Sequence, residues 1–122
     1  MRAVLFVDDS SDICQVIEAM CQSLPDVKCV CVTSMSAVQE RAPQVLRTSL
    51  AILDVNLGGG EPSGVDIYRW LRERSYKGRI AFLSGHARTD PRVEEAARIS
   101  GVDFFQKPLA FDQIEALILG TH

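Results

Sequence analysis

The sequence predicts an α/β fold, in which a doubly wound, five-stranded parallel sheet carries helices on both faces. Five short apolar runs, rich in β-branched or aromatic residues, have the length of strands. They cover residues 3–7, 27–32, 50–53, 80–83 and 102–105. The stretches between these runs have the spacing of helices, and strands that alternate with helical crossovers form parallel sheets.

The first helical stretch covers about residues 11–24. Ser10 or Ser11 can cap its start, and Pro25 follows its end. An apolar stripe is expected to face the sheet, and it consists of Ile13, Val16, Ile17, Met20 and Leu24.

Four further helices are expected. The second covers about residues 36–47 and contains Pro43, which should kink or shorten it, and the third covers about residues 65–74. The fourth begins at Asp90 and Pro91 and ends at Gly101, and the fifth covers about residues 111–119. With right-handed crossovers, the leading arrangement is the flavodoxin-like strand order 2-1-3-4-5.

Length and composition bound the class of protein. The 122 residues suit a single domain, 1–122, and 47% apolar residues predict a globule. A net charge of -3 argues against direct nucleic-acid binding as the main role. No apolar run has the length of a membrane span, and the run 3–7 is too short for a signal peptide, so we expect a cytoplasmic protein without a membrane role.

The four cysteines form two spaced pairs. Cys14 and Cys21 lie seven apart, on one helical face, and Cys29 and Cys31 lie two apart, on one strand face. We interpret them as small buried hydrophobic residues in a reducing compartment. A metal or redox site is the alternative, but the spacing matches neither a zinc site of the C-x-x-C type nor a thioredoxin motif.

Reactive or charged side chains follow four of the five expected strands. Asp8 and Asp9 come after the first, Asp54 after the third, Ser84 after the fourth and Lys107 after the fifth. In an open α/β sheet the functional site lies beyond the carboxyl ends of the strands. Each residue alone would be a turn former, a helix cap or a solvated strand end. Their placement at one rim predicts a functional site.

Three carboxylates at one rim repel one another. A pair about 4 Å apart costs on the order of 4 kcal/mol at an effective dielectric constant of 20. Lys107 and a divalent cation would balance the three acids, and oxygen-only ligands suit Mg²⁺ (or Mn²⁺). The residues therefore predict a magnesium site that handles phosphate.

At this point the chain resembles the receiver domains of response regulators, of the chemotaxis-regulator-like kind used in two-component and phosphorelay systems. The matching features are the Asp8-Asp9 pair, Asp54 within Leu53-Asp54-Val55-Asn56, Ser84-Gly85 and Lys107-Pro108. The resemblance extends over about residues 3–119. All four features, in this order and at these spacings, are specific to the family.

The resemblance implies a phosphoprotein that catalyses only its own phosphorylation and dephosphorylation. Asp54 would take a phosphoryl group from a phosphohistidine on a histidine kinase or phosphotransfer protein, forming an aspartyl phosphate. Lys107 and Ser84 would bind phosphoryl oxygens. The Mg²⁺ ligands would be the carboxylates of Asp9 and Asp54, the backbone carbonyl of Asn56 and, through water, Asp8.

The resemblance also implies a switch. Ser84 would move toward the phosphoryl group and make room for Phe104 to rotate. The family often has Tyr there, and Phe104 lacks the hydroxyl that could fix an outward state. A downstream protein target would bind the face formed by the fourth helix, the strand 102–105 and the helix 111–119. The Lys107-Pro108 peptide bond would be cis.

Other functions remain open at this stage. One is a receiver-fold binding module that works without phosphorylation. Another is a Mg²⁺ phosphohydrolase of the haloacid-dehalogenase kind, although that family needs a second acid where this chain has Asn56. A flavin-binding protein shares the fold, but three acids at the phosphate position oppose it. The cognate kinase, the output target and the extent of the native chain are left open.

The chain departs from the family in two segments near the site. The loop 57–64 is longer than usual and richer in glycine, and we expect it to be mobile. His86 lies two residues after Ser84. It is either an exposed loop histidine or, together with Asn56, a residue that governs the access of water to the acyl phosphate.

Replacing His86 with alanine tests the second possibility. If His86 controls the attacking water, the lifetime of the acyl phosphate on Asp54 should change, which release of phosphate after removal of the donor would measure. Arg88→Ala, two residues further along the chain, is the control. An unchanged lifetime in His86→Ala would remove this residue from the mechanism.

Overall fold

The computed structural model describes residues 2–55, 57, 62–85, 91–107 and 110–120. The strands are β1 (Arg2–Val7), β2 (Val27–Val32), β3 (Leu50–Asp54), β4 (Arg79–Ser84) and β5 (Asp103–Gln106). The helices are α1 (Ser11–Gln22), α2 (Met35–Glu40), α3 (Ala42–Val45), α4 (Gly64–Glu73), α5 (Pro91–Ala97) and α6 (Phe111–Leu119). All strand pairs are parallel and the order is β2-β1-β3-β4-β5, which confirms the predicted fold.

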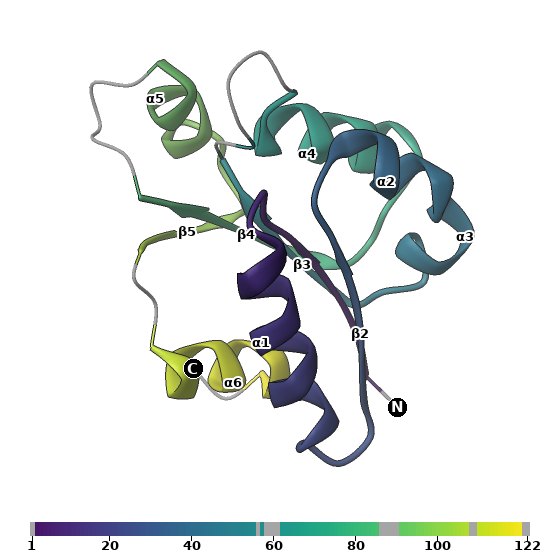
Figure 1. Cartoon of the computed structure of the whole chain (residues 1–122). Helices are drawn as coiled ribbons and strands as arrows, with labels where there is room; N and C mark the ends of the chain where they lie inside the picture. The colour runs from purple at the N-terminus through teal and green to yellow at the C-terminus, as the bar shows by residue number, and fades with distance from the viewer. Residues whose placement is uncertain (1, 56, 58–61, 86–90, 108–109, 121–122) are drawn as a thin grey trace.

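Helices cover both faces of the sheet (Figure 1). One apolar cluster joins α1 and α6 to one face, and a second cluster joins α2, α3, α4 and α5 to the other. The strands supply both clusters by alternation, so that Leu50 and Ile52 face α1 and α6 while Ala51 and Leu53 face the opposite layer. The sheet is therefore the shared core of a three-layer domain.

The central strand β3 is buried along its whole length. Burial of a Leu or Ile side chain contributes about 1.5–3 kcal/mol, so Leu50, Ile52 and Leu53 anchor this strand firmly. Its neighbours are held in register, with Val7 opposite Leu53 and Leu53 opposite Phe82. This register brings the carboxyl ends of the inner strands to one rim.

The expected helix over residues 36–47 is divided in two. α2 ends at Glu40, and α3 begins at Ala42 with Pro43 as its second residue. Proline is tolerated in the first turn of a helix but not in its interior. The expectation that Pro43 shortens the helix is thus confirmed, and a second short helix follows it.

The predicted inward stripe of the first helix is correct for Ile17, Met20 and Leu24, which are buried or pack in the cluster on the sheet, but wrong for Ile13 and Val16. The residues of α1 that lie buried against the sheet are Cys14, Ile17 and Cys21, whereas Ile13 and Val16 are 43% and 42% exposed. Cysteine behaves as a small apolar residue, so it takes the positions closest to the sheet. The larger side chains of Ile13 and Val16 are left on the flank.

The fourth predicted helix ends earlier than expected. α5 stops at Ala97, four residues before Gly101, which has a left-handed φ of 79°. The glycine therefore serves the turn into β5, because left-handed backbone suits a residue without a Cβ.

The four cysteines are free, with Cys14 and Cys21 buried and Cys29 and Cys31 half-buried. This agrees with their interpretation as apolar packing residues. Among the described residues, no helix is long and apolar enough to cross a membrane.

Candidate functional site

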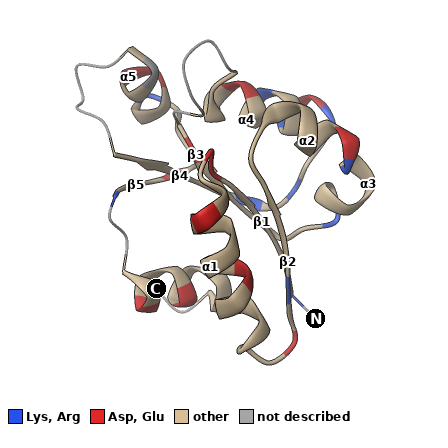
Figure 2. Ribbon diagram, in the orientation of Figure 1, with Lys and Arg blue, Asp and Glu red and all other residues tan. Residues whose placement is uncertain are grey.

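The predicted site residues gather at one rim of the sheet, where the inner parallel strands end. Asp8 and Asp9 follow β1, Asp54 and Ser84 are the last residues of β3 and β4, and Lys107 follows β5. Figure 2 shows the acidic segment after β1 at the middle of this rim. The parallel register alone brings together side chains that lie up to 99 residues apart in the sequence.

Three carboxylates form the centre of the site. One oxygen from each of Asp8, Asp9 and Asp54 lies within 4.8 Å of the others. Asp8 and Asp54 are only 1% and 3% exposed, while Asp9 is open to solvent. Burying carboxylates so close together is unfavourable unless positive charge is near them.

Lys107 supplies that positive charge to the two buried acids. Its Nζ donates to Asp8 Oδ2 at 2.8 Å and to Asp54 Oδ2 at 3.1 Å. Burial of the ammonium lowers the pKa of Lys107, but the hydrogen bond to Asp8 and the charges of Asp54 and Asp8 outweigh it, so the pKa lies above its ordinary value. Lys107 therefore stays cationic throughout the physiological pH range.

Backbone contacts hold these side chains in place. The N–H of Lys107 donates to the carbonyl of Ser84 at 2.8 Å, which extends the pairing of β4 with β5 to the lysine itself. The N–H of Ser10 donates to Asp8 Oδ1 at 3.0 Å. Asp8 thus presents one carboxylate oxygen to the start of α1 and the other to Lys107.

Gly64, the first residue of α4, packs directly against the end of β3. A Cβ at this position would collide with the backbone carbonyl oxygen of Asp54. The N–H of Gly64 also donates to the carbonyl of Val55 at 3.0 Å. The absence of a side chain lets α4 approach the strand end that carries Asp54, a contact that sequence reasoning did not identify.

The proposed switch residues lie on adjacent strands. Ser84 is fully buried and pairs in register with Gln106, and Phe104 pairs with Phe82. Phe104 is half-buried and packs against the cluster that contains Phe82. The backbone carbonyl of Asn56, the side chain of His86 and the Lys107-Pro108 peptide bond lie outside the described residues, as does most of the loop 57–64.

An apolar cavity of about 190 Å³ adjoins the charged centre. Asp8 and Lys107 line it together with apolar residues of β1, α1, β4 and α6, among them Ile13, Val16 and Phe111. These three are the exposed large hydrophobic residues of the described chain. Sequence reasoning missed this feature because it assigned Ile13 and Val16 to the inward stripe.

Solved structures share this fold over nearly the whole chain. A response regulator receiver domain from Clostridium thermocellum matches with a TM-score of 0.78 and 19% identity, over 99% of this chain and 94% of that one. A response regulator from Burkholderia pseudomallei, solved with a phosphorylated aspartic acid and a calcium ion, matches with a TM-score of 0.77 and 17% identity, over 97% of this chain and 66% of that one.

Curated relatives are similar in sequence. The response regulator protein TmoT of Ectopseudomonas mendocina is 30% identical over 86% of this chain and 46% of its own length. A putative NtrX-like response regulator of Rickettsia bellii is 29% identical over 94% of this chain and 23% of its own length. The chain thus spans less than half the length of these two relatives.

The family model for the response regulator receiver domain matches residues 4–119. The chain therefore belongs to the receiver domain family of response regulators, which acts in two-component signalling.

Proposed function

We propose that Asp54 is the phospho-acceptor and receives its phosphoryl group from a phosphohistidine on a histidine kinase or a phosphotransfer protein. The observation that carries this proposal is the placement of a buried carboxylate at the end of β3, in contact with Lys107 and within 4.8 Å of two further acids. The fold neighbour from Burkholderia pseudomallei, which carries a phosphorylated aspartic acid, supports it.

The transfer is a displacement at phosphorus. A carboxylate oxygen of Asp54 forms the new O–P bond while the P–N bond to the partner's histidine breaks, and the electron pair of that bond returns to the imidazole. This step needs little covalent assistance but does need positioning and neutralisation of charge. Lys107 would bind one phosphoryl oxygen, and the Ser84 hydroxyl would donate to another.

The donor set fits a divalent cation. Three carboxylates face the single ammonium of Lys107, so the cluster carries a formal charge of -2. All available ligand atoms are oxygens, which Mg²⁺ and Mn²⁺ prefer. Asp9 and Asp54 would hold the ion, with the backbone carbonyl of Asn56 as a third ligand and Asp8 acting through water. When bound, the ion would neutralise charge on the phosphoryl oxygens.

The signal would pass from β4 to β5. Attraction of Ser84 to the phosphoryl group would change the packing beside Phe104, since the two strands are paired. The output face would consist of α5, β5 and α6, where a downstream protein would bind. His86 and Asn56 would set the lifetime of the acyl phosphate.

The phosphodonor would dock over the apolar cavity beside the acids. Ile13, Val16 and Phe111 are exposed there, and the same cavity is lined by Asp8 and Lys107. A protein that covers these side chains is therefore held next to Asp54. Exposed apolar groups of this kind mark protein interaction sites.

Asp54→Asn should abolish phosphorylation and leave the fold intact, because it removes a repelling charge without removing a core contact. Phosphoryl incorporation from a small donor, followed by mass spectrometry in the presence of Mg²⁺, measures the first effect, and circular dichroism the second. Asp12→Asn, an exposed carboxylate of α1, is the matched control and should incorporate phosphate normally. Incorporation at the wild-type level in Asp54→Asn would overturn the assignment.

Lys107→Met should lower the free energy of unfolding by about 1–3 kcal/mol in the absence of divalent ions, because two buried carboxylates lose their cation. Mg²⁺ should recover part of this loss by supplying positive charge at the same place. Urea denaturation with and without Mg²⁺ measures both effects. Lys77→Met, at an exposed lysine, should stay within about 0.5 kcal/mol of the wild type. Equal effects of the two substitutions would contradict the charge balance described here.

Val16→Glu should slow phosphorylation by a phosphohistidine-bearing protein at least about tenfold, since a charge desolvated in such an interface costs more than about 1.4 kcal/mol. Its phosphorylation by a small donor should be unchanged. Gln15→Glu introduces the same charge on the neighbouring exposed position of α1 and is the control. If Val16→Glu slows both donors alike, the substitution disturbs the site itself and the docking surface is wrong.

A further inference from the structure

Four free cysteines lie where α1 packs on β2, on the side of the sheet opposite α2 and α4. Cys21, Cys29 and Cys31 pack in the same apolar cluster, and Cys21 and Cys29 line the same cavity. Cys14 lies nearer the start of α1, where its sulfur is 3.6 Å from the carbonyl oxygen of Val32. The cysteines therefore form a chain along the contact between a helix and a strand, and none belongs to the phosphorylation site.

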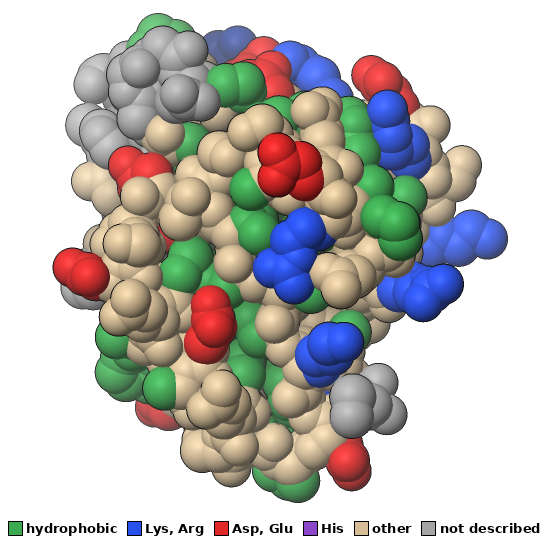
Figure 3. Space-filling model, turned by 45° about the vertical axis from the view of Figure 1, so that its right-hand side comes forward, with side chains coloured by type: hydrophobic (Ala, Val, Ile, Leu, Met, Phe, Trp, Pro, Cys, Tyr) green, Lys and Arg blue, Asp and Glu red, His purple; other side chains and the backbone are tan. Residues whose placement is uncertain are grey.

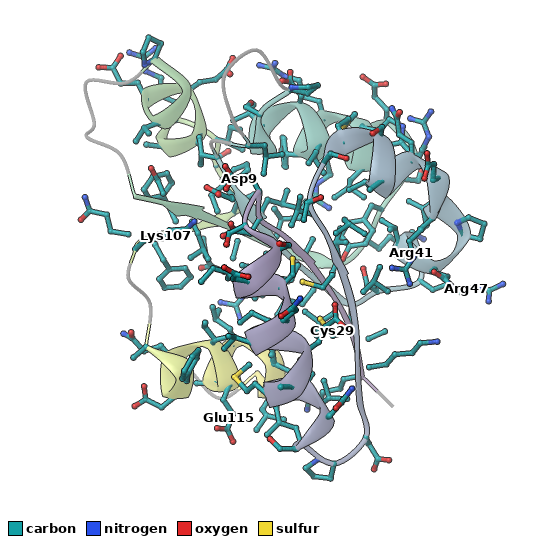
Figure 4. The ribbon with its side chains drawn as sticks, in the orientation of Figure 1. Asp9, Cys29, Arg41, Arg47, Lys107 and Glu115 are labelled. Carbon is teal, nitrogen blue, oxygen red and sulfur yellow. The ribbon has the colours of Figure 1, made fainter. Side chains whose placement is uncertain are left out.

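One end of this chain is open to solvent. A cavity of about 320 Å³ lies at the α1–β2 contact, and its lining consists of Glu18, Cys21, Gln22, Val27, Lys28 and Cys29. Figure 4 shows Cys29 between α1 and β2. Cys21 is 2% exposed whereas Cys29 is half-buried, so a small reagent in the cavity meets Cys29 first.

The other end is closed. The sulfur of Cys14 lies 3.6 Å from the carbonyl oxygen of Val32 and 3.9 Å from that of Asp8, and it donates to both. Cys14 is buried and lies next to the acidic centre. It is therefore a packing residue, and Cys21 and Cys29 are the pair that a reagent can reach.

The surroundings of Cys29 favour its thiolate. Its pKa is lowered chiefly by the hydrogen bond with Cys21, then by that with Cys31, and further by the charge of Arg41, all against the opposing effect of burial. The pKa of Cys21 is raised by its hydrogen bond with Cys29 and by burial. Figure 3 shows that basic side chains lie mainly from the centre to the right of that face of the molecule, with acidic side chains among them. Of the two, Cys29 is the nucleophile and Cys21 the proton-bearing partner.

We propose that Cys29 and Cys21 form an oxidation site, in which a hydroperoxide reacts at Cys29 and Cys21 closes a disulfide between α1 and β2. This site is independent of the phosphorylation proposed above, and it lies near the opposite end of α1 from the acids. Cys29 has three properties that redox-sensitive cysteines share: access to solvent, a thiolate-stabilising environment and a neighbouring thiol that can resolve the oxidised form.

The chemistry proceeds in two balanced steps. The Cys29 thiolate attacks the peroxide, an S–O bond forms, the O–O bond breaks, and the departing oxygen takes a proton to leave as water or an alcohol. Cys29 is thereby oxidised to sulfenic acid and the peroxide is reduced. The sulfur of Cys21 then attacks Cys29, so that the S–S bond forms, the S–O bond breaks and water leaves with the proton of Cys21.

The arrangement of the thiols disfavours a metal site. Among the described residues, the one group of three or more candidate ligands that lie within 4.8 Å of one another is the aspartate cluster. A zinc site with thiolate ligands needs the sulfurs gathered around one point. Cys21 and Cys29 instead line one cavity as a pair, which suits a disulfide.

Oxidation of the reduced protein with hydrogen peroxide tests the proposal. After free thiols are blocked by alkylation, peptide mapping should find a disulfide between Cys21 and Cys29, with Cys14 and Cys31 alkylated. Cleavage after Glu18 and after Lys28 places Cys14, Cys21 and the Cys29 region in separate peptides, and tandem fragmentation distinguishes Cys29 from Cys31. In the untreated protein at neutral pH, Cys29 should alkylate at least about tenfold faster than Cys21.

Variants separate the roles of the two cysteines. Cys29→Ser should lose the disulfide, Cys21→Ser should accumulate a sulfenic acid at Cys29 that a diketone probe traps, and Cys31→Ser, on the same face of β2, should retain the disulfide. Oxidation at Cys14 and Cys31 instead, or four thiols that all remain alkylatable after peroxide, would overturn the proposal. The alkylation rates are measured on the wild-type protein, so they test the greater reactivity of Cys29 over Cys21 even where a variant fails to fold.

Discussion

The balance between three carboxylates and one ammonium is the constraint on which the site depends. Asp8 and Asp54 are buried beside each other, and Lys107 contacts both of them. Asp8, Asp54 and Lys107 come from the ends of three different strands. Their charges therefore balance only when β1, β3 and β5 keep their register in the sheet. Lys107 offsets only part of the formal negative charge of the three acids. Binding of the proposed cation would therefore be coupled to folding through the same few atoms.

The rim could be predicted from the sequence because parallel strands all end at the same edge of a sheet. Once five apolar runs alternate with helices, the residues after Val7, Leu53 and Leu83 must meet at the carboxyl ends of the strands. This reasoning needs only strand positions and not side-chain detail. It placed Asp8, Asp54 and Lys107 together, as the structure does.

Features that depend on packing between elements were not predictable in the same way. The rotation of α1 is decided by small cysteines that fit against β2, whereas a hydrophobicity pattern favours the larger Ile13 and Val16. The approach of Gly64 to the Asp54 carbonyl likewise depends on how α4 packs on the end of β3. Local patterns carry no information about such partners.

The uneven burial of the strands has a consequence for local stability. Every residue of β3 is buried, whereas β5 is a four-residue edge strand whose residues are half-buried or exposed. Free energies of local opening follow the number of buried contacts that must be broken, so β3 opens only with the whole domain while β5 can loosen alone. Asp54 therefore stands on the most resistant strand, and Phe104 stands on the most yielding one. A change of charge at Asp54, on the rigid strand β3, would then displace β5, the strand that costs the least free energy to move.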